Sequence, residues 1–410
     1  MTATSIGSGS DKLVLAVSED AYGGDAQFTV SVDGQQVGGT LTATAPHGSG
    51  QSDTVNVLGN WAAGAHTVTV NFLNDAWGGS AAKDRNLYVD GATYDGAAVS
   101  GTATALRASG PQSFGLTDPG STFTWSGAPA PQPKANPGDT LTIAGGTYAA
   151  QGSQLSGVTV NLAGSQAAPA SLALQNGSVG KIELVSLSGG DLSVPKYGNL
   201  TVAGTVTVEG ALQSGGRPAA PGALAVTLNG GATLNLNGGR LADGASLVIT
   251  GPAGSTVTNA GTLSLANTRG FAIHADLAGA GTIQSVPTAA SSGVAIELDG
   301  AVSAGQTVRL DGGTLQLDQP MRFMGTVAGF TTSAPGGPAS SLRLAHAEVT
   351  AASFQQSAGN AGALSVSMQD PATGAAGTAM IRVAGSFASN AFVFTNDAAT
   401  QAAVIRLAPL

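Results

Sequence analysis

Two short segments concentrate acidic, amide, aromatic and glycine residues in a chain that otherwise carries little charge. The first is VSEDAYGGDAQFTVSVDG at residues 17–34, and the second is VNFLNDAWGGSAAKDRNLYVD at residues 70–90. Each contains an acidic cluster, an aromatic residue, a Gly-Gly pair and then a further Asp. Hard cations such as Ca²⁺ take about six to eight oxygen ligands from carboxylates, amides and backbone carbonyls. Neither segment supplies that many oxygens alone, so we expect the two to meet around one ion.

Other metal sites fit these segments less well. The regular aspartate spacing of an EF-hand is missing, and no cysteine or paired histidine suggests zinc. Aspartate and asparagine beside glycine also mark ordinary turns, which is the simpler alternative. The shared order of residue types and the local excess of acid favour a metal site. Residues 1–120 carry eleven acidic and four basic groups, against thirteen and eleven in the remainder, a balance that argues against a nucleic-acid partner.

Three stretches resemble the calcium-dependent xylan-binding carbohydrate-binding modules, a β-sandwich family: SEDAYGGDAQFTVSVDGQQVGG, GNWAAGAHTVTVNFLNDAWGG and DRNLYVDGATYDG. The resemblance runs over about residues 8–118. In that family, vicinal hydroxyls of the sugar bind a protein-bound Ca²⁺ directly. The resemblance implies that the metal is held by the carboxylates of Asp20, Asp25 and Asp75 and the carbonyls of Gly24 and Trp77, with Glu19 and Asp84 as outer ligands. It implies sugar contacts from Tyr22, Trp77, Asn74 and Asn86.

A site of this kind recognises pairs of adjacent hydroxyls rather than one sugar. The resemblance therefore implies a polysaccharide ligand, either xylan-like or another glycan with vicinal hydroxyls. No catalytic domain of the expected kind follows the module, which leaves xylan itself open. The histidines at 47 and 66 lie in turns and are expected at the surface, and Trp61 is expected in the core.

The elements that must position these residues are short β-strands. Glycine is abundant, with 61 residues, and charged residues make up only 10% of the chain, a composition typical of strands and tight turns. Alternation in KLVLAVS, FTVSV and HTVTVNF places one apolar set on one face of each strand. The pattern predicts a jelly-roll-like β-sandwich over residues 1–118, in an all-β protein.

Residues 119–410 have a different sequence pattern. A proline-rich segment at 119–138 predicts a linker or cap. From 139 to 410, short apolar runs end repeatedly in Gly, Asn or Asp, as in LAVTLNGGATLNLNGG and TVRLDGGTLQLD. This pattern predicts a parallel β-solenoid or β-helix of about twelve turns, each of roughly 20–25 residues. The repeats blur from about residue 320, where we expect a terminal cap or a small separate unit. A stack of sandwich domains is the alternative.

The function predicted from these features is non-catalytic binding. The chain is interpreted as a Ca²⁺-dependent polysaccharide-binding adhesin or biofilm matrix component, with the solenoid as a spacer that could self-associate into fibres. The composition of the predicted solenoid resembles that of bacterial adhesin stalks. A β-helix polysaccharide-degrading enzyme is one alternative, and its carboxylates would be sought at Glu297, Asp299 and Asp311. A phage or appendage fibre is another.

The cellular location is predicted only in outline. The chain has no cysteine, which excludes disulfides and thiol chemistry. The residues MTATSIGSGSDK lack the basic and apolar regions of a signal peptide, and no apolar run reaches the length of a membrane span. We expect a secreted or cell-surface bacterial protein whose export route is not evident.

Overall fold

The computed structural model describes residues 2–9, 11–127, 132–165, 167–184, 196–210, 212–214, 222–242, 244–268, 270–286, 294–332, 339–357 and 359–408. The chain forms two compact units. The first comprises residues 1–121 and 136–139, and the second comprises residues 122–135 and 140–410. Part of the proline-rich segment, residues 128–131, lies outside the described residues.

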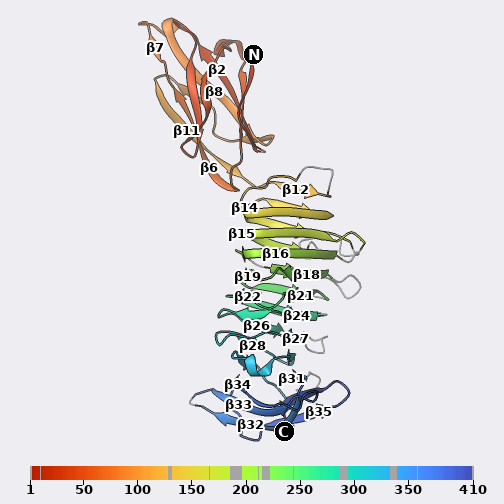
Figure 1. The fold of residues 1–410 in the computed structure, drawn as a ribbon. Coiled ribbons are helices and arrows are strands. Elements are labelled where there is room, and N and C mark those ends of the chain that lie inside the picture. The colour runs from red at the N-terminus through yellow and green to blue at the C-terminus, as the bar shows by residue number, and fades with distance from the viewer. Residues whose placement is uncertain are drawn as a thin grey trace. The chain divides into compact units, whose positions relative to one another are not determined.

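The first unit is a two-sheet β-structure (Figure 1). One sheet has the order β1-β5-β2-β8-β10, with β7 and β9 also pairing with β8, and the other has the order β11-β6-β3-β4. Two short 3₁₀ turns, η1 (His47–Ser49) and η2 (Ala81–Lys83), complete it. Its strands are β1 (Ala3–Gly7), β2 (Asp11–Asp20), β3 (Gln27–Val32), β4 (Gln35–Thr42), β5 (Asp53–Gly59), β6 (Gly64–Phe72), β7 (Ala76–Trp77), β8 (Asp84–Tyr94), β9 (Ala97–Val99), β10 (Thr104–Leu106) and β11 (Gly110–Asp118).

The apolar alternation of the sequence accounts for this core. Successive side chains of a strand point to opposite faces, so every second residue can be buried. Leu13, Leu15 and Val17 of β2 are fully buried, and Phe28 and Val30 of β3 face them in the same cluster. Full burial of each such side chain contributes about 1.5–3 kcal/mol. The predicted inward faces are therefore confirmed.

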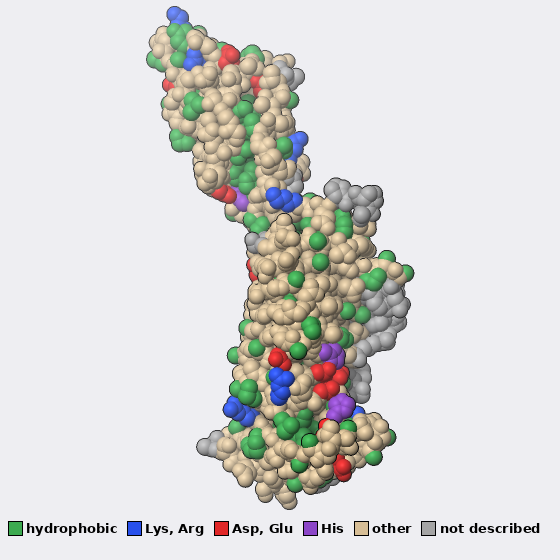
Figure 2. All heavy atoms as spheres, viewed as in Figure 1, with side chains coloured by type: hydrophobic (Ala, Val, Ile, Leu, Met, Phe, Trp, Pro, Cys, Tyr) green, Lys and Arg blue, Asp and Glu red, His purple; other side chains and the backbone are tan. Residues whose placement is uncertain are grey.

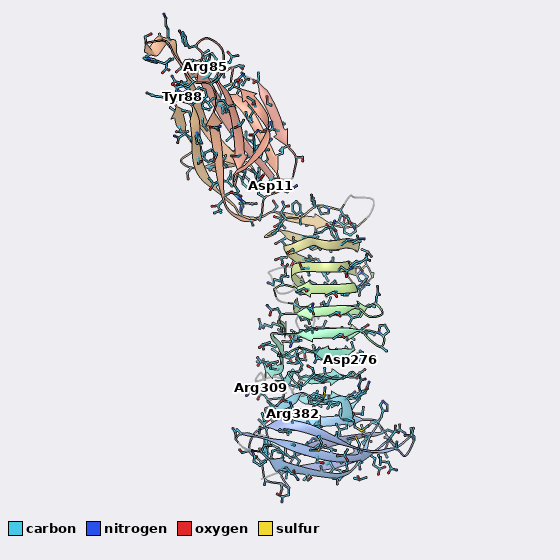
Figure 3. All side chains as sticks on the ribbon, turned by 60° about the vertical axis from the view of Figure 1, so that its left-hand side comes forward. Asp11, Arg85, Tyr88, Asp276, Arg309 and Arg382 are labelled. Carbon is cyan, nitrogen blue, oxygen red and sulfur yellow. The ribbon has the colours of Figure 1, made fainter. Side chains whose placement is uncertain are left out.

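The pairing of β2 with β8 brings distant residues to one end of the first unit. The two strands are antiparallel, and Asp20 lies opposite Asn86 while Ser18 lies opposite Tyr88. Figure 3 shows Arg85 and Tyr88 at this end and Asp11 at the other. The turn that follows β2 and the turn that precedes β8 therefore lie at the same end of the sheet.

The second unit is a parallel β-solenoid, which confirms the predicted fold class. Its strands form three stacks along the coils: β16-β18-β21-β24-β27-β29-β31, β16-β19-β22-β25 and β17-β20-β23-β26-β28-β30. The solenoid strands are β12 (Thr122–Trp125), β13 (Thr140–Ile143), β14 (Gly146–Leu162), β15 (Ala170–Leu184), β16 (Lys196–Val208), β17 (Leu212–Ser214), β18 (Gly222–Leu228), β19 (Thr233–Leu236), β20 (Gly239–Ala242), β21 (Ser246–Thr250), β22 (Thr256–Asn259), β23 (Thr262–Ala266), β24 (Gly270–His274), β25 (Asp276–Ala278), β26 (Thr282–Val286), β27 (Ala295–Leu298), β28 (Thr307–Arg309), β29 (Thr314–Leu317), β30 (Thr326–Ala328) and β31 (Ser341–Ala345).

Apolar columns run through the coils and explain why they stack. The register of neighbouring strands aligns the buried side chains Val226, Ile249, Ile273, Leu298, Leu317 and Leu344 in one column. A lone coil could not bury these side chains, so each coil depends on its neighbours.

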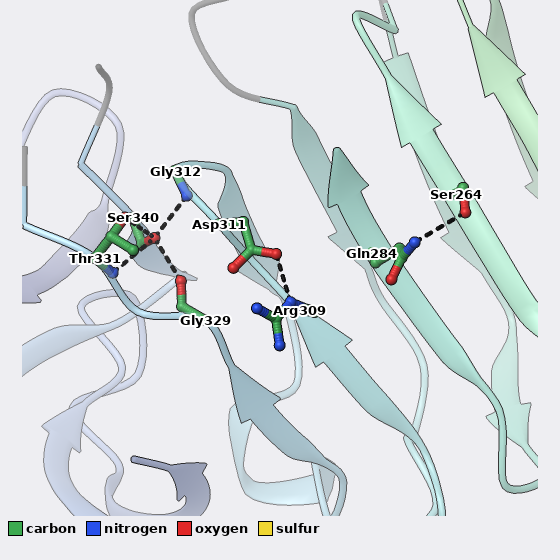
Figure 4. A network of polar contacts seen from close by, with 8 residues as sticks. All are labelled: Ser264, Gln284, Arg309, Asp311, Gly312, Gly329, Thr331 and Ser340. Atoms are coloured by element: carbon green, nitrogen blue, oxygen red, sulfur yellow. Dashed lines mark hydrogen bonds and ion pairs between the residues drawn. The ribbon is translucent and has the colours of Figure 1, made fainter. Parts of the chain in front are cut away.

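Polar side chains reinforce the outer surface and the corners of the coils. On β26, Gln284 donates to the hydroxyl of Ser264 in the preceding coil at 3.1 Å (Figure 4). Ser340 is fully buried and accepts from the backbone N–H of Gly312 at 2.9 Å. Asp311, with a φ of 40°, closes the same turn and pairs with Arg309. The polar residues between the apolar runs thus serve as turn and ladder residues.

The last part of the chain departs from the solenoid pattern. A 3₁₀ turn, η4 (Pro320–Arg322), precedes it, and its strands are β32 (Glu348–Gln356), β33 (Ala361–Gln369), β34 (Ala376–Ala384), β35 (Phe392–Asp397) and β36 (Ala402–Leu407). β32, β33 and β34 form an antiparallel meander, and β35 pairs with β36. The solenoid therefore has fewer turns than the twelve expected, because antiparallel strands replace coils here and several coils exceed 25 residues.

The described residues are all-β. They contain no α-helix, and none of their helical segments has the length and apolar character needed to cross a bilayer.

Candidate metal and ligand site

Two loops of the first unit meet at the end where β2 and β8 pair. The first loop (residues 21–26) joins β2 to β3, and the second loop (residues 73–83) joins β6 to β8. The side chain of Asn74 fastens one to the other, since its Oδ1 accepts from the backbone of Gln27 at 2.7 Å and its Nδ2 donates to the carbonyl of Asp25 at 3.0 Å. The two acidic segments singled out in the sequence therefore lie side by side, as expected. Asn74, predicted as a sugar contact, has a structural position between them.

Arg85 ties the same two loops together from beneath. Arg85 is 7% exposed, and its guanidinium donates to the carbonyls of Gly24 at 2.8 Å, Asn74 at 2.6 Å and Tyr22. A planar guanidinium offers five donors in a fixed geometry, so it can hold three carbonyls where an ammonium cannot do so with the same precision. Sequence reasoning missed Arg85. The signal was an arginine within an otherwise acidic and amide-rich segment.

Asp20 is oriented by a hydrogen bond from Tyr88. The phenol donates to Asp20 Oδ2 at 2.7 Å. Burial, with the neighbouring Asp20 carboxylate, raises the pKa of Tyr88 to about 12, so the phenol is a hydrogen-bond donor at neutral pH. The Tyr88 ring stacks on His47 with centroids 3.7 Å apart, and His47 Nδ1 lies 2.8 Å from Ser18 Oγ. His47 is exposed, as expected from the sequence, and its ring also supports the tyrosine that orients Asp20.

Two buried oxygens at this end have no hydrogen-bond partner among the described residues. They are Oδ1 of Asp75 and Oδ1 of Asn86. The backbone N–H of Asp75 donates to Ser109 Oγ at 2.9 Å, and Asn86 Nδ2 donates to Asp84 Oδ2 at 3.1 Å. An unsatisfied buried acceptor costs about 1–3 kcal/mol. A bound cation, which accepts electron pairs from oxygens, is one partner that would satisfy such an acceptor.

Glu19 lies below the first loop rather than at its surface. Its side chain accepts from the backbone N–H of Ala26 at 2.6 Å, and the residue is 3% exposed. Burial raises the pKa of Glu19, and the nearby Asp25 adds to this effect. Glu19 therefore closes the base of the loop.

The donor set fits a hard cation. The carboxylates of Asp20, Asp25 and Asp75 and the amide of Asn86 offer oxygen ligands, and the ring of His47 is engaged by Tyr88 and Ser18. The carboxylate oxygens of Asp20, Asp25 and Asp75 do not all lie within 4.8 Å of one another. Among the described residues, the group of acidic and histidine side chains that is this compact lies in the second unit. The carbonyl of Gly24, predicted as a ligand, faces Arg85. Ligand roles for these residues, and for the Trp77 carbonyl, stay predictions.

The two predicted aromatic contacts differ in exposure. Trp77 is 62% exposed and presents its indole to solvent. Tyr22 is half-buried, and its hydroxyl lies so close to Gly78 that a Cβ there would sit 2.4 Å from it. Glycine at 78 therefore lets the second loop close on Tyr22. Of the two rings, Trp77 is the one with an open face for a sugar.

The solenoid holds the other acidic residues considered from the sequence. Glu297 and Asp299 gather with His274, and one ligand atom from each lies within 4.8 Å of those of the other two. Asp311, named with them as a candidate catalytic acid, instead closes a turn and pairs with Arg309.

Comparison with known proteins supports the assignment of the first unit. Residues 12–106 match the CBM60 family model, a Ca-dependent carbohydrate-binding module described as xylan-binding. None of the curated proteins compared matches the chain. Among solved structures, the catalytic unit of a thermostable GH87 α-1,3-glucanase from Streptomyces thermodiastaticus strain HF3-3 aligns over 77% of this chain and 80% of that chain, at 13% identity and a TM-score of 0.17. A likeness at that level carries no argument.

The chain thus combines a carbohydrate-binding module with a β-solenoid. The module is of the calcium-dependent xylan-binding family, so Ca²⁺ is its cofactor.

Proposed function

We propose that this protein is a non-catalytic, Ca²⁺-dependent polysaccharide-binding protein of the cell surface or extracellular matrix, secreted from the cell that makes it. The observation that carries the proposal is the junction of the two loops by Asn74 and Arg85. This junction holds oxygen donors from both loops at one end of the module. Beside them, Trp77 exposes an aromatic face suited to a sugar ring.

The ligand we propose is a glycan with vicinal hydroxyls, such as xylan. Ca²⁺ takes about six to eight oxygen ligands, and we propose that the protein leaves part of this coordination sphere open. Adjacent sugar hydroxyls would complete the sphere by displacing water. Recognition of a diol makes the module tolerant of several polysaccharides and makes binding strictly dependent on the ion.

The solenoid is proposed to act as a spacer that carries the module away from its anchoring surface. Its low charge and continuous apolar columns suit a rigid spacer. At the C-terminal end, β34 pairs with β30 and β36 pairs with β31. Backbone groups of the last coil are therefore already engaged, so association into fibres through this end would require those strands to move.

A glycan array read with and without Ca²⁺ tests the proposal. We expect the full chain to retain xylan-like polysaccharides in millimolar Ca²⁺, to lose them in EDTA, and to regain them when Ca²⁺ is restored. Retention in EDTA would overturn the calcium-dependent mode. Reducing-sugar release measured on the retained polysaccharides checks the non-catalytic part, and turnover would refute it.

A further inference from the structure

A second cluster of metal-ligating residue types lies on the outer surface of the solenoid, far along the sequence from the carbohydrate-binding module. Its members are His274, Glu297 and Asp299, whose ligand atoms lie within 4.8 Å of one another. In Figure 2, acidic and histidine side chains gather on one part of the solenoid surface, near Lys and Arg side chains. The cluster is neither a turn motif nor part of the site described above.

The parallel register of two coils creates this cluster. Ala272 pairs with Glu297 and Ile273 with Leu298. The backbone N–H of Asp299 continues the ladder to the carbonyl of Ile273, so His274 and Asp299 are neighbours in adjacent coils. Since alternate residues of a strand share a face, Glu297 and Asp299 point to the same side as His274. The stacked backbone therefore brings the three residues together on one face.

Neighbouring groups hydrogen-bond to the cluster and leave one of its oxygens without a partner among the described residues. Gln316 in the next coil donates to Glu297 Oε1 at 3.0 Å and to Asp318 Oδ1 at 3.1 Å. Nδ1 of His274 contacts Oδ2 of Asp299. The other oxygen of that carboxylate, Oδ1, is buried and has no hydrogen-bond partner among the described residues. Carboxylates held close together with an unsatisfied oxygen are an arrangement that a bound cation stabilises.

An open cavity adjoins the cluster. It has a volume of about 370 Å³, and His274 and Asp299 line it together with residues 251–255, Asp276 and Arg322. Arg322 lies 3.5 Å from Asp276 on the wall of this cavity. The cavity gives solvent and small polar ligands access to one side of the cluster. Figure 3 marks Asp276 on this stretch of the solenoid.

We propose that His274, Glu297 and Asp299 bind a divalent transition-metal ion such as Zn²⁺, Co²⁺ or Mn²⁺. Imidazole combined with carboxylates suits these ions, whereas Ca²⁺ takes oxygen ligands. The ion would lie between the imidazole and the two carboxylates, whose ligand atoms are already within 4.8 Å of one another. Three protein ligands leave at least one coordination position open on the cavity side, where water or a hydroxyl of a ligand can bind. Gln316 acts as the positioning residue that keeps Glu297 turned toward the ion.

Cobalt binding to the full chain tests this site. With Ca²⁺ kept in millimolar excess to fill the oxygen-only site, Co²⁺ is added and its visible absorption is recorded. We expect one equivalent to bind, and we expect excess Zn²⁺ to displace it. His274→Gln and Glu297→Gln should each weaken Co²⁺ binding at least tenfold. Asp276→Asn is the matched control, because it lines the same cavity outside the cluster, and it should bind Co²⁺ as the wild type does.

Circular dichroism and the melting temperature establish that each variant is folded. A wild-type chain that binds no Co²⁺ or Zn²⁺ in the presence of Ca²⁺ would overturn the proposal and show that His274 and Asp299 make only a structural hydrogen bond. Unchanged Co²⁺ affinity in both His274→Gln and Glu297→Gln would place the metal elsewhere and overturn it equally. Glycan retention by the first unit is a separate readout, so either proposal can fail alone.

Discussion

Nε of Arg85 lies 2.8 Å from the carbonyl oxygen of Gly24, although the two residues are 61 positions apart in the sequence. The same guanidinium donates to the carbonyl of Asn74 in the other loop. The buried guanidinium of Arg85 thus sets the distance between the two loops that carry the acidic residues. The ligand geometry of the module depends on a residue that is itself no metal ligand.

Replacing Arg85 with lysine should therefore separate charge from geometry. Lysine keeps the positive charge but cannot hold three carbonyls in one plane. We expect the free energy of unfolding to fall by about 1.5–3 kcal/mol and glycan affinity in Ca²⁺ to fall at least tenfold, measured by urea unfolding and isothermal titration calorimetry. Arg107→Lys, at an exposed position, is the control. Wild-type affinity in Arg85→Lys would show that the guanidinium geometry is irrelevant.

Trp77→Ala should weaken sugar binding while leaving the fold and the ion in place. The indole is 62% exposed, so little core packing is lost, and stacking on an aromatic ring contributes about 0.5–1.5 kcal/mol. Glycan affinity should drop about two- to tenfold, with Ca²⁺ affinity measured in the absence of glycan unchanged. Trp61→Phe, in a half-buried ring packed against the core, should show the opposite pattern of lower stability and unchanged affinity. If Trp77→Ala bound glycan as the wild type does, the sugar would contact another face.

The sequence was sufficient for the fold class and for the inward faces of the strands formed by KLVLAVS, FTVSV and HTVTVNF. Alternation alone identified Leu13, Leu15 and Val17 as inward residues, because a strand has a fixed period of two. The short apolar runs closed by glycine likewise predicted the solenoid. These features are local, so a single chain displays them without any knowledge of which strands pair.

Contacts that depend on register could not be predicted. Tyr88 reaches Asp20 only because β8 pairs with β2 in one alignment. In the solenoid, Ala170 pairs with Gly198, 28 residues on, whereas Ala295 pairs with Thr314, only 19 residues on. Because the coil length varies, no fixed spacing reveals that His274 will lie beside Asp299. The sequence pattern favoured a turn-closing role for that aspartate.

Asp53 should make the stability of the first unit sensitive to acid. Burial alone would raise the pKa of Asp53, but N–H groups of Thr2 and Thr44 donate to its carboxylate and hold the pKa well below its usual range. A carboxyl whose folded-state pKa is depressed contributes stability above its unfolded-state pKa and loses it as pH falls toward the folded-state value.

The free energy of unfolding should accordingly decline as pH drops below about 4, the ordinary pKa of an aspartate. Urea unfolding of the full chain, followed by tryptophan fluorescence at a series of pH values, measures this decline. Asp53→Asn should be less stable than the wild type at pH 7, and the difference should shrink at low pH. Asp90→Asn, at an exposed position, is the control. Parallel pH profiles for Asp53→Asn and the wild type would contradict the assignment.

The apolar columns of the solenoid should carry most of its stability. Ile249 is fully buried between Val226 and Ile273 of the adjacent coils, so Ile249→Ala leaves a cavity that neighbouring coils cannot close without losing their own register. We expect a loss of about 2–5 kcal/mol. Gln284→Ala, which removes only the outer hydrogen bond to Ser264, should cost less than about 1 kcal/mol. Urea unfolding followed by far-UV circular dichroism compares the two. Equal effects would mean that the outer polar ladders, rather than the columns, hold the coils together. Because coils stabilise their neighbours in such arrays, Ile249→Ala should also broaden the unfolding transition.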